Sequence, residues 1–460
     1  MKVMSKQKDK LWSILPEIFK IFNDSDDMEE ARNRIYNFCK NLEWDYRKGV
    51  KLLHKLDYAT ALESINVFTN LISPRNEKIS GFSTLQCLWE LAKDQLTTPR
   101  QLSDAFIEEC RHLFLAMAGK TNIARGWLGP LLEKDGIKTE IFSSVKPEPP
   151  FELADECARI ARKEKVDLLI GLGGGSSMDT AKGASIVMTN GGSITDYFGI
   201  DIVPKPGFPT FLIPTTSGTG AEVTRNAIFK DVKAKAKKAV VSRHILPRVA
   251  IVDPELMLTI PPRVTAYTGI DALSHALESF LSKMANPLSE MYALQAIGLV
   301  AENLPRAVKD GRDMTARENM AIAALCGGIS LIAGAGGIAA TSYPVEGRFE
   351  VAHGLGNSIM MPYVLRYNAP ANLGRAKKLA QLLGIDIHGL SDDAVVDSLV
   401  ERISGLIQEV GLPLKLREVG VNEEDIPMLA EEAFQNKRLI NANPRELTVE
   451  SFKEIYREAV

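Results

Sequence analysis

The sequence lacks the features that mark several classes of protein. Its 460 residues carry 55 lysines and arginines against 58 aspartates and glutamates, a net charge of −3, so no basic excess is available to neutralise nucleic-acid phosphates. No long uncharged hydrophobic run occurs, and no hydrophobic core of a secretory signal follows the charged first ten residues. We therefore expect no nucleic-acid partner, no membrane span and a cytoplasmic location.

Cysteine is scarce and irregularly placed. The cysteines are odd in number, widely spaced and free of any C-x-x-C pair: Cys39, Cys87, Cys110, Cys157 and Cys326. This pattern predicts reduced thiols and no structural zinc knuckle. With 45% hydrophobic and 25% charged residues, the composition is that of an ordinary globular protein, and the length predicts at least two domains.

Hydrophobic patterning divides the chain into three regions. Residues 1–111 carry apolar residues at three- and four-residue steps, which predicts a helical extension. Residues 112–259 alternate short apolar runs with amphipathic segments, which predicts an α/β domain with a parallel sheet. Residues 260–460 carry helical periodicity almost throughout, which predicts an all-α domain.

The expected elements follow from these periodicities. In the extension, helices are expected at Leu11–Phe22, Glu29–Leu42 and Ala59–Leu71. In the α/β region, we expect a helix at Glu152–Glu164 and strands at Lys138–Phe142, Val166–Gly171, Thr210–Ile213 and Val249–Val252. In the last region, helices are expected at Leu273–Met284, Ser289–Leu304, Ala316–Ile332 and Val395–Val410. Periodicity leaves Leu113–Ala118 open between a helical turn and a short buried strand.

Two loops at the ends of expected strands carry ligand-binding chemistry. The first reads Gly171-Leu-Gly-Gly-Gly-Ser-Ser-Met-Asp179-Thr-Ala-Lys182, which lacks the Walker A spacing but opens a helix. Its glycines and free helical N–H groups suit a phosphate or pyrophosphate, although a tight turn without a ligand fits the same residues. The second, Pro214-Thr-Thr-Ser-Gly-Thr-Gly-Ala-Glu222, gathers hydroxyl groups where open α/β sheets bind ligands.

The third region contains candidate metal ligands. Asp271 and His275 are four residues apart on an expected helix and therefore share one face. A carboxylate and an imidazole so placed suit Fe²⁺ or Zn²⁺, while a local hydrogen bond between the two is the simpler alternative. His353 precedes Gly354 at an expected helix start, a position that is also typical of structural histidines.

These four motifs, in this order, resemble those of the iron-containing alcohol dehydrogenase family over about Leu113 to Val460. The resemblance implies an N-terminal α/β domain that binds NAD(P), a helical domain that holds a divalent metal, and a small alcohol, aldehyde or ketone between them. Fe²⁺ is the expected metal, with Zn²⁺ as the alternative, and a homodimer is the expected assembly. The resemblance also favours a strand at Leu113–Ala118.

The resemblance assigns roles residue by residue. It implies that the metal is held by Asp271, His275 and His353. It implies that the cofactor pyrophosphate contacts Gly173, Gly174, Gly175 and Ser176, with Asp179 and Lys182 nearby. It implies that the nicotinamide side is lined by Thr215, Thr216, Ser217 and Thr219, with Lys237 facing the cofactor. Tyr343 and Asp179 are the candidate catalytic residues.

The sequence departs from the family at several positions. The usual fourth ligand, a histidine fourteen residues before His353, falls at Ala339, and a second family histidine falls at Tyr343. Glu346 is a candidate replacement ligand, although it lies two helical turns, about 10 Å, beyond Ala339. Tyr343 is able to donate a proton or hydrogen bond where the family has a histidine. Gly119, before Lys120, stands where the family has an aspartate for the cofactor ribose.

Three functions fit these observations. The first is a metal-dependent oxidoreductase that interconverts an alcohol and an aldehyde or ketone with NAD(P), because both loops and three ligands are retained together. The second is a catalytically degenerate member that binds a partner through its helical extension, which Ala339 favours. The third is a lyase or cyclase similar to dehydroquinate synthase, which uses the nicotinamide only transiently.

Overall fold

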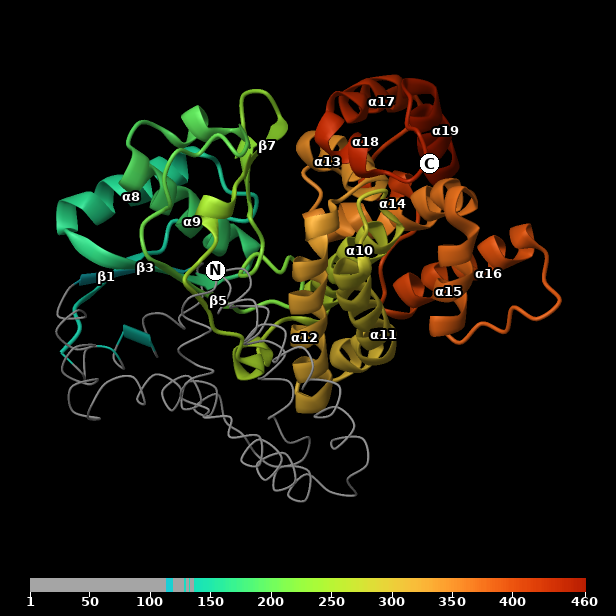
Figure 1. Cartoon of the computed structure of the whole chain (residues 1–460), viewed down its shortest axis with the longest axis horizontal. Coiled ribbons are helices and arrows are strands. Elements are labelled where there is room, and N and C mark those ends of the chain that lie inside the picture. Colours follow the sequence, from blue (N-terminus) through green and yellow to red (C-terminus); the bar gives the residue numbers. More distant parts are fainter. Residues whose placement is uncertain (1–112, 119–127, 130–131, 133–135) are drawn as a thin grey trace, which may run out of the picture. The chain divides into compact units, whose positions relative to one another are not determined.

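The computed structural model describes residues 113–118, 128–129, 132 and 136–460 (Figure 1). The chain divides into two compact units, Met1–Ala105 and Phe106–Val460, and all described residues belong to the second. The helices expected within residues 1–111, and Gly119 with Lys120, lie outside the described residues.

The α/β part is built around a parallel sheet of five strands in the order β2-β1-β3-β5-β8. These strands are β1 (Leu113–Ala118), β2 (Thr139–Phe142), β3 (Val166–Gly173), β5 (Thr210–Pro214) and β8 (Val249–Ala250). The segment Leu113–Ala118 is thus a strand, as the resemblance favours. β3 is almost continuously buried, which is expected of a central strand covered on both faces.

Helices connect and cover these strands. α8 (Glu152–Glu164) has Glu152 in its first turn and Arg162 and Lys163 in its last, which complements the helix dipole. α9 (Gly175–Asn190) packs against β3, β5 and α8. The predicted helix at Glu152–Glu164 and the predicted strands are confirmed, with the ends of the strands shifted by one or two residues.

A second, smaller sheet was not predicted from the sequence. It consists of β4 (Gly199–Ile200), β6 (Asn226–Asp231) and β7 (Ala236–Val241), where β6 and β7 form an antiparallel hairpin. β6 alternates buried residues, Ala227 and Phe229, with less buried ones, and this two-residue period is the signal that reveals such a strand. The hairpin matters for the site because β7 contacts a helix of the C-terminal part, α13.

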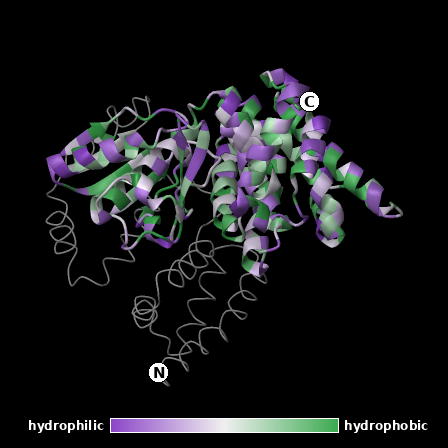
Figure 2. Cartoon of the chain, turned by 90° about the horizontal axis from the view of Figure 1, so that it is seen from above, coloured by the Kyte–Doolittle hydropathy of each residue, from purple (hydrophilic) through white to green (hydrophobic). Residues whose placement is uncertain are grey.

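The chain from Pro262 onward is helical, as expected. The helices are α10 (Pro262–Leu281), α11 (Pro287–Lys309), α12 (Met314–Ser330), α13 (Gly337–Phe349), α14 (His353–Asn368), α15 (Leu373–Leu382), α16 (Asp392–Glu409), α17 (Ile426–Gln435), α18 (Lys437–Ala442) and α19 (Val449–Ala459). Figure 2 shows hydrophilic and hydrophobic turns alternating along several helices, which is typical of amphipathic packing.

The central helix of this part is α10. It contacts α11, α12 and α14, and its residues from Gly269 to Leu281 are all buried. Such a helix holds polar side chains rigidly because every neighbour is packed. Among the described residues no single helix has the length and hydropathy of a membrane span, and only the bent pair Met314–Ala333 and Gly337–Phe349, at 107°, meets those criteria when taken together.

Candidate metal centre and cofactor loops

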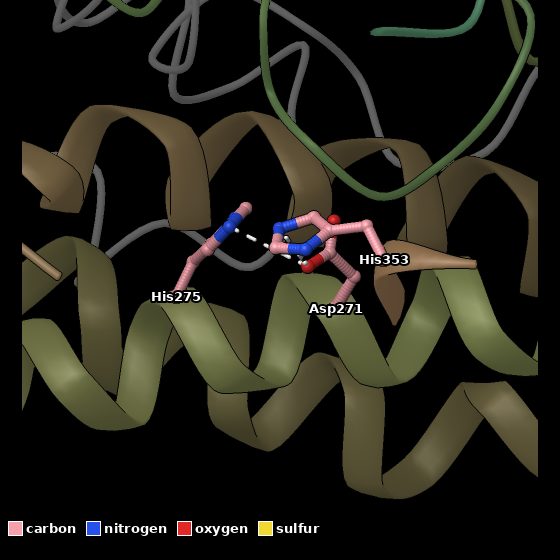
Figure 3. Close-up of side chains that lie close together, drawn as sticks. All are labelled: Asp271, His275 and His353. Atoms are coloured by element: carbon pink, nitrogen blue, oxygen red, sulfur yellow. Dashed lines mark ion pairs between the residues drawn. The ribbon is translucent and has the colours of Figure 1, made fainter. Parts of the chain in front are cut away.

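Asp271, His275 and His353 converge at one point (Figure 3). Asp271 and His275 project from the same face of α10, and His353 is the first residue of α14. Nε2 of each histidine lies 3.5 Å from Oδ1 of Asp271. Ligands held at about 2.1 Å around one ion are about 3.0–3.4 Å apart, so a modest contraction suits a first-row divalent metal.

A hydrogen-bond network fixes the carboxylate of the triad. Asn357 Nδ2 donates to Asp271 Oδ1 at 2.8 Å and to Ser274 Oγ at 3.2 Å. Ser342 Oγ donates to Asn357 Oδ1, which orients the amide so that its NH₂ group faces Asp271. Asp271 is 2% exposed, and hydrogen bonds to a buried ligand are what hold it in one orientation.

Glu346 supports the third member of the triad from behind. Its Oε1 lies 2.8 Å from Nδ1 of His353, the ring nitrogen that does not face Asp271. Glu346 therefore stands on the far side of the imidazole, and its oxygens are not part of the converging group. In a metal-bound state, a carboxylate behind a histidine in this way would hold the proton on Nδ1 and leave Nε2 to coordinate.

Lys237 reaches Glu346 from the α/β part. Its ammonium pairs with Glu346 and, at 3.1 Å, with Glu148, and its side chain is 6% exposed. Burial lowers the pKa of Lys237, but the two carboxylates outweigh burial and raise it above its ordinary value. The contact runs from β7 to α13 and on to His353.

The two histidines of the triad have different electrostatic environments. Burial lowers the pKa of His275, and the nearby His353 lowers it further despite Asp271. Burial also lowers the pKa of His353, but the Glu346 carboxylate outweighs burial and raises it above its ordinary value. His275 Nδ1 is buried without a hydrogen-bond partner among the described residues, so the free imidazole is incompletely satisfied.

Close helix packing explains why glycine follows His353. A Cβ atom on Gly354 would lie 2.1 Å from the carbonyl oxygen of Tyr267 on α10, a distance that no side chain tolerates. Glycine thus allows α14 to begin directly against α10, which places His353 beside Asp271. Ala339, in the first turn of α13, is buried, and the carboxylate of Glu278 accepts hydrogen bonds from the N–H groups of Ile338 and Ala339.

The two cofactor loops predicted from the sequence lie against each other. A Cβ atom on Gly174 would lie 3.3 Å from Thr216 Oγ1, and one on Gly175 would lie 2.8 Å from Thr219 Cγ2. Gly174 caps α9, so the first N–H groups of a 16-residue helix open onto this junction. Gly173 has φ of +147°, a conformation that favours glycine. Both loops follow adjacent parallel strands, β3 and β5.

Further contacts fix other predicted residues of the two loops. Thr215 and Ser217 are buried, and Ser217 Oγ contacts Met257 Sδ at 2.9 Å. Asp179 accepts a hydrogen bond from Ile228 N–H at 3.0 Å and pairs with Lys182. Lys182 in turn donates to Ala221 O at 2.8 Å. Asp179 and Lys182 therefore connect α9 to β6 and to the end of the hydroxyl-rich loop.

Tyr343 lies between the triad and an open pocket. Its ring centroid is 5.7 Å from that of His353 and 4.9 Å from Lys237 Nζ, and its hydroxyl is hydrogen-bonded to Arg438. Burial raises the pKa of Tyr343 above its ordinary value, although Arg438 and Lys237 act in the opposite direction. The phenol is therefore protonated at neutral pH.

Sequence reasoning missed several residues of this site. Asn357 lies four positions after His353 and so shares its helical face, a signal that was available. Glu346 was considered only as a ligand, and its position behind His353 depends on how α13 and α14 pack. Nothing in the sequence pattern links Arg438 to Tyr343, because the two are distant along the chain.

Two family models match the chain. Residues 100–254 match the model described as iron-containing alcohol dehydrogenase, and residues 265–460 match the model described as Fe-containing alcohol dehydrogenase family, C-terminal. The two matches together take in both cofactor loops and all three residues of the triad.

Individual relatives agree with these matches. An NAD-dependent methanol dehydrogenase of Bacillus methanolicus is 39% identical over 330 residues, 72% of this chain and 86% of the relative. The crystal structure of a 1,3-propanediol oxidoreductase aligns with a TM-score of 0.73 at 34% identity, over 79% of this chain and 96% of that one. A sulfoacetaldehyde reductase of Bifidobacterium kashiwanohense, in complex with NAD⁺, aligns with a TM-score of 0.69 at 30% identity, over 78% and 94%. The chain belongs to the iron-containing alcohol dehydrogenase family.

Proposed function

We propose that this protein is a metal-dependent oxidoreductase that interconverts a small alcohol and an aldehyde or ketone with NAD(P). The observation that carries the proposal is the convergence of Asp271, His275 and His353 in a chain that retains both cofactor loops. The relatives named above are an alcohol dehydrogenase, a diol oxidoreductase and an aldehyde reductase. All three names describe redox chemistry at an alcohol or aldehyde carbon, which favours this reading over a lyase or a non-catalytic partner protein.

The triad fits a divalent metal by its donor set. One buried carboxylate and two imidazoles suit Fe²⁺, with Zn²⁺ as the alternative. Asp271 is oriented by Asn357, and His353 by Glu346, so two of the three proposed ligands are fixed before a metal arrives. Three protein ligands leave open positions for a substrate oxygen. When bound, the metal polarises that oxygen while the nicotinamide gives or takes hydride.

The loops at the ends of β3 and β5 suit the dinucleotide. We assign the pyrophosphate to the N-terminus of α9, at Gly173, Gly174, Gly175 and Ser176, where N–H groups and the helix dipole favour an anion. We assign the nicotinamide side to Thr215, Thr216, Ser217 and Thr219. Lys237 forms ion pairs with Glu346 and Glu148, so we assign it an electrostatic rather than a hydrogen-bonding interaction with the cofactor. Asp179 positions β6 against α9 through Ile228.

Tyr343 is the proposed proton donor. It keeps its phenolic proton at neutral pH because burial raises its pKa, and its ring packs edge-on against the ring of His353. In the reducing direction it gives a proton or hydrogen bond to the substrate oxygen, and Arg438 and Lys237 then stabilise the phenolate. The pKa of a free tyrosine is about 10, so these two cations are needed for the step.

Metal content and turnover test the proposal together. Protein purified without oxygen or chelators should contain about one iron, zinc or manganese per chain by elemental mass spectrometry, and an Asp271→Asn variant should contain far less. The loaded enzyme should oxidise NADH or NADPH in the presence of short aldehydes. A chain that takes up no metal after reconstitution, or that binds no NAD(P)H at millimolar concentration, would refute the proposal.

We also propose that the enzyme works as a cytoplasmic homodimer. Cys326 is a buried free thiol, which supports a reducing compartment. Sedimentation of the purified chain should give a mass of two chains, and a sharp one-chain boundary at micromolar concentration would contradict the dimer.

A further inference from the structure

A cationic pocket opens beside the metal triad. It has a volume of about 310 Å³, which is at the lower end of small-molecule sites. Its walls come from the hairpin, from α13 and from the start of α18, and its lining residues are Phe198, Gly199, Ile228, Lys237, Lys238, Ala239, Tyr343, Asn436 and Arg438. The pocket adjoins the triad because its lining residue Tyr343 stacks edge-on against His353.

The lining carries three cations and no carboxylate. Lys237 is already balanced, because Glu346 and Glu148 both pair with it. Lys238 and Arg438 have no such partner, since within the described residues neither forms an ion pair with an acidic side chain. Arg438 is instead half-buried and directed at the Tyr343 hydroxyl. Asn436 adds an amide donor on the same wall.

We propose that this pocket binds the oxyanion of the substrate, so that the enzyme acts on a small aldehyde or alcohol that carries a carboxylate, sulfonate or phosphonate. The inference rests on the proposed function and extends it to a substrate class. A guanidinium forms paired hydrogen bonds with the planar or tetrahedral oxygens of such groups. A neutral alcohol would leave the half-buried Arg438 without a counter-charge in a concave site, where desolvation of a charge is costly, whereas the exposed Lys238 adds positive potential at the rim.

The position of Arg438 gives the anion a second effect. Its guanidinium contacts the hydroxyl of Tyr343, the proposed proton donor. When the anionic end of the substrate binds Arg438, it contacts the same guanidinium that orients the phenol of Tyr343. The carbonyl end of the substrate then faces His353. Binding energy from the non-reacting end of the substrate is thus used to orient the reacting end.

Matched substrates test the inference on the metal-loaded enzyme. 4-Oxobutanoate is compared with pentanal, and phosphonoacetaldehyde and sulfoacetaldehyde with propanal, by NADH or NADPH oxidation. We expect the anionic aldehydes to have the higher kcat/KM, and added salt to weaken them selectively. Arg438→Gln should lower kcat for every aldehyde through its lost contact with Tyr343, and should in addition raise KM for the anionic aldehydes alone, so that their kcat/KM falls about 10- to 100-fold more than that of the neutral ones.

Two control variants distinguish a specific effect of Arg438 from a general effect of positive charge near the pocket. Lys437→Gln removes a neighbouring cation whose ammonium lies over the Phe434 ring, and it should leave the anionic preference intact. Arg438→Lys keeps the positive charge but loses the paired hydrogen bonds of the guanidinium, so it should retain part of the preference for anionic aldehydes. Ethanesulfonate, titrated calorimetrically into the wild type and into Arg438→Gln, provides a readout that does not depend on turnover, and only the wild type should bind it.

Several outcomes would overturn the inference while leaving the proposed function standing. One is equal turnover of anionic and neutral aldehydes, with Arg438→Gln lowering both alike, which would mean that Arg438 acts only through Tyr343. Another is an Arg438→Gln variant in which only the KM for NADH or NADPH rises, which would assign the pocket to the cofactor. Loss of turnover with every aldehyde in a metal-loaded wild type would instead count against the proposed function.

Discussion

At the scale of single residues, Glu346 differs most from its sequence-based interpretation. From the sequence it is one candidate replacement for the absent histidine at Ala339, yet its carboxylate contacts Nδ1 of His353 and the ammonium of Lys237. Burial raises the pKa of Glu346, but His353 and Lys237 outweigh burial and hold it well below its ordinary value. The residue is thus an anion at every physiological pH, which is the state that a supporting carboxylate needs.

Glu346→Gln tests this supporting role. The amide keeps the shape of the side chain but removes the charge that orients His353 and balances Lys237. We expect metal affinity to fall about 10- to 100-fold, measured by competition with a chromogenic chelator. Glu432→Gln, which breaks the Arg348–Glu432 pair at the surface, is the matched control and should leave affinity unchanged. Equal affinities of wild type and Glu346→Gln would show that Glu346 does not support the metal.

A second residue-scale prediction concerns stability and pH. Burial raises the pKa of Glu222, next to the hydroxyl-rich loop, to about 7 from an ordinary 4.5. The folded state therefore holds a proton that the unfolded state releases between pH 4.5 and 7, so this group's contribution to stability is lost as pH rises through that window. Glu222→Gln should remove that loss and gain about 3 kcal/mol above pH 7 relative to wild type.

Denaturant midpoints at pH 5 and pH 8 provide the check. The gap between Glu222→Gln and wild type should open only at pH 8. Glu454→Gln, an exposed position on α19, should show no gap at either pH. If the denaturant midpoints of Glu222→Gln and wild type differ by the same amount at pH 5 and at pH 8, Glu222 is not buried as a neutral acid.

At the scale of elements, the site depends on how closely α14 approaches α10. α10 supplies Asp271 and His275 from one face, and its neighbour must bring His353 within reach of the same point. Gly354 permits that approach because no side chain separates it from the Tyr267 carbonyl. The Asn357–Asp271 hydrogen bond then ties the two helices one turn further along.

Gly354→Ala should therefore push the two helices apart. We expect a destabilisation of about 1–3 kcal/mol from overpacking and a loss of metal binding, measured by thermal unfolding and elemental analysis. Gly405→Ala is the control, because nothing lies within 4 Å of a Cβ atom at this position in α16. It should gain about 0.5–1 kcal/mol from helix propensity. Full metal content in Gly354→Ala would contradict the packing argument.

At the scale of the whole molecule, the site links the two parts of the described chain. Lys237 on β7 and Glu346 on α13 form a buried ion pair between the α/β and helical parts, and the proposed metal joins α10 to α14 within the helical part. A ligand that binds only the folded state stabilises it by mass action. Metal and stability are therefore expected to be coupled.

Removal of the metal tests this coupling. Chelation of the loaded wild type should lower its Tm, and re-addition should restore it, by the equivalent of about 2.7 kcal/mol at a metal concentration one hundred times Kd. Asp271→Asn, measured in the same scanning calorimetry series, should show no response to chelator. An equal shift in this variant would place the stabilising metal elsewhere in the chain.

The sequence by itself determined what depends on local hydrogen bonding and on neighbouring residues. A helical period of 3.6 residues places Asp271 and His275 on one face, and glycines between a strand and a helix predict an anion site at Gly174 and Gly175. Hydrophobic periodicity also predicted four strands of the parallel sheet, β2, β3, β5 and β8, and parts of α8, α10, α11, α12 and α16, and the ordered motifs identified the family.

Only the tertiary structure decided which distant residues meet. The antiparallel hairpin, the contact of Lys237 with Glu346, and the meeting of Tyr343 with Arg438 all join segments far apart in the chain. Their positions follow from how whole helices and strands pack, a sum of many small apolar contacts that no local pattern encodes. For that reason the candidate metal ligands could be named from the sequence, whereas the position of Glu346 behind His353 and the cationic pocket emerged only from the fold.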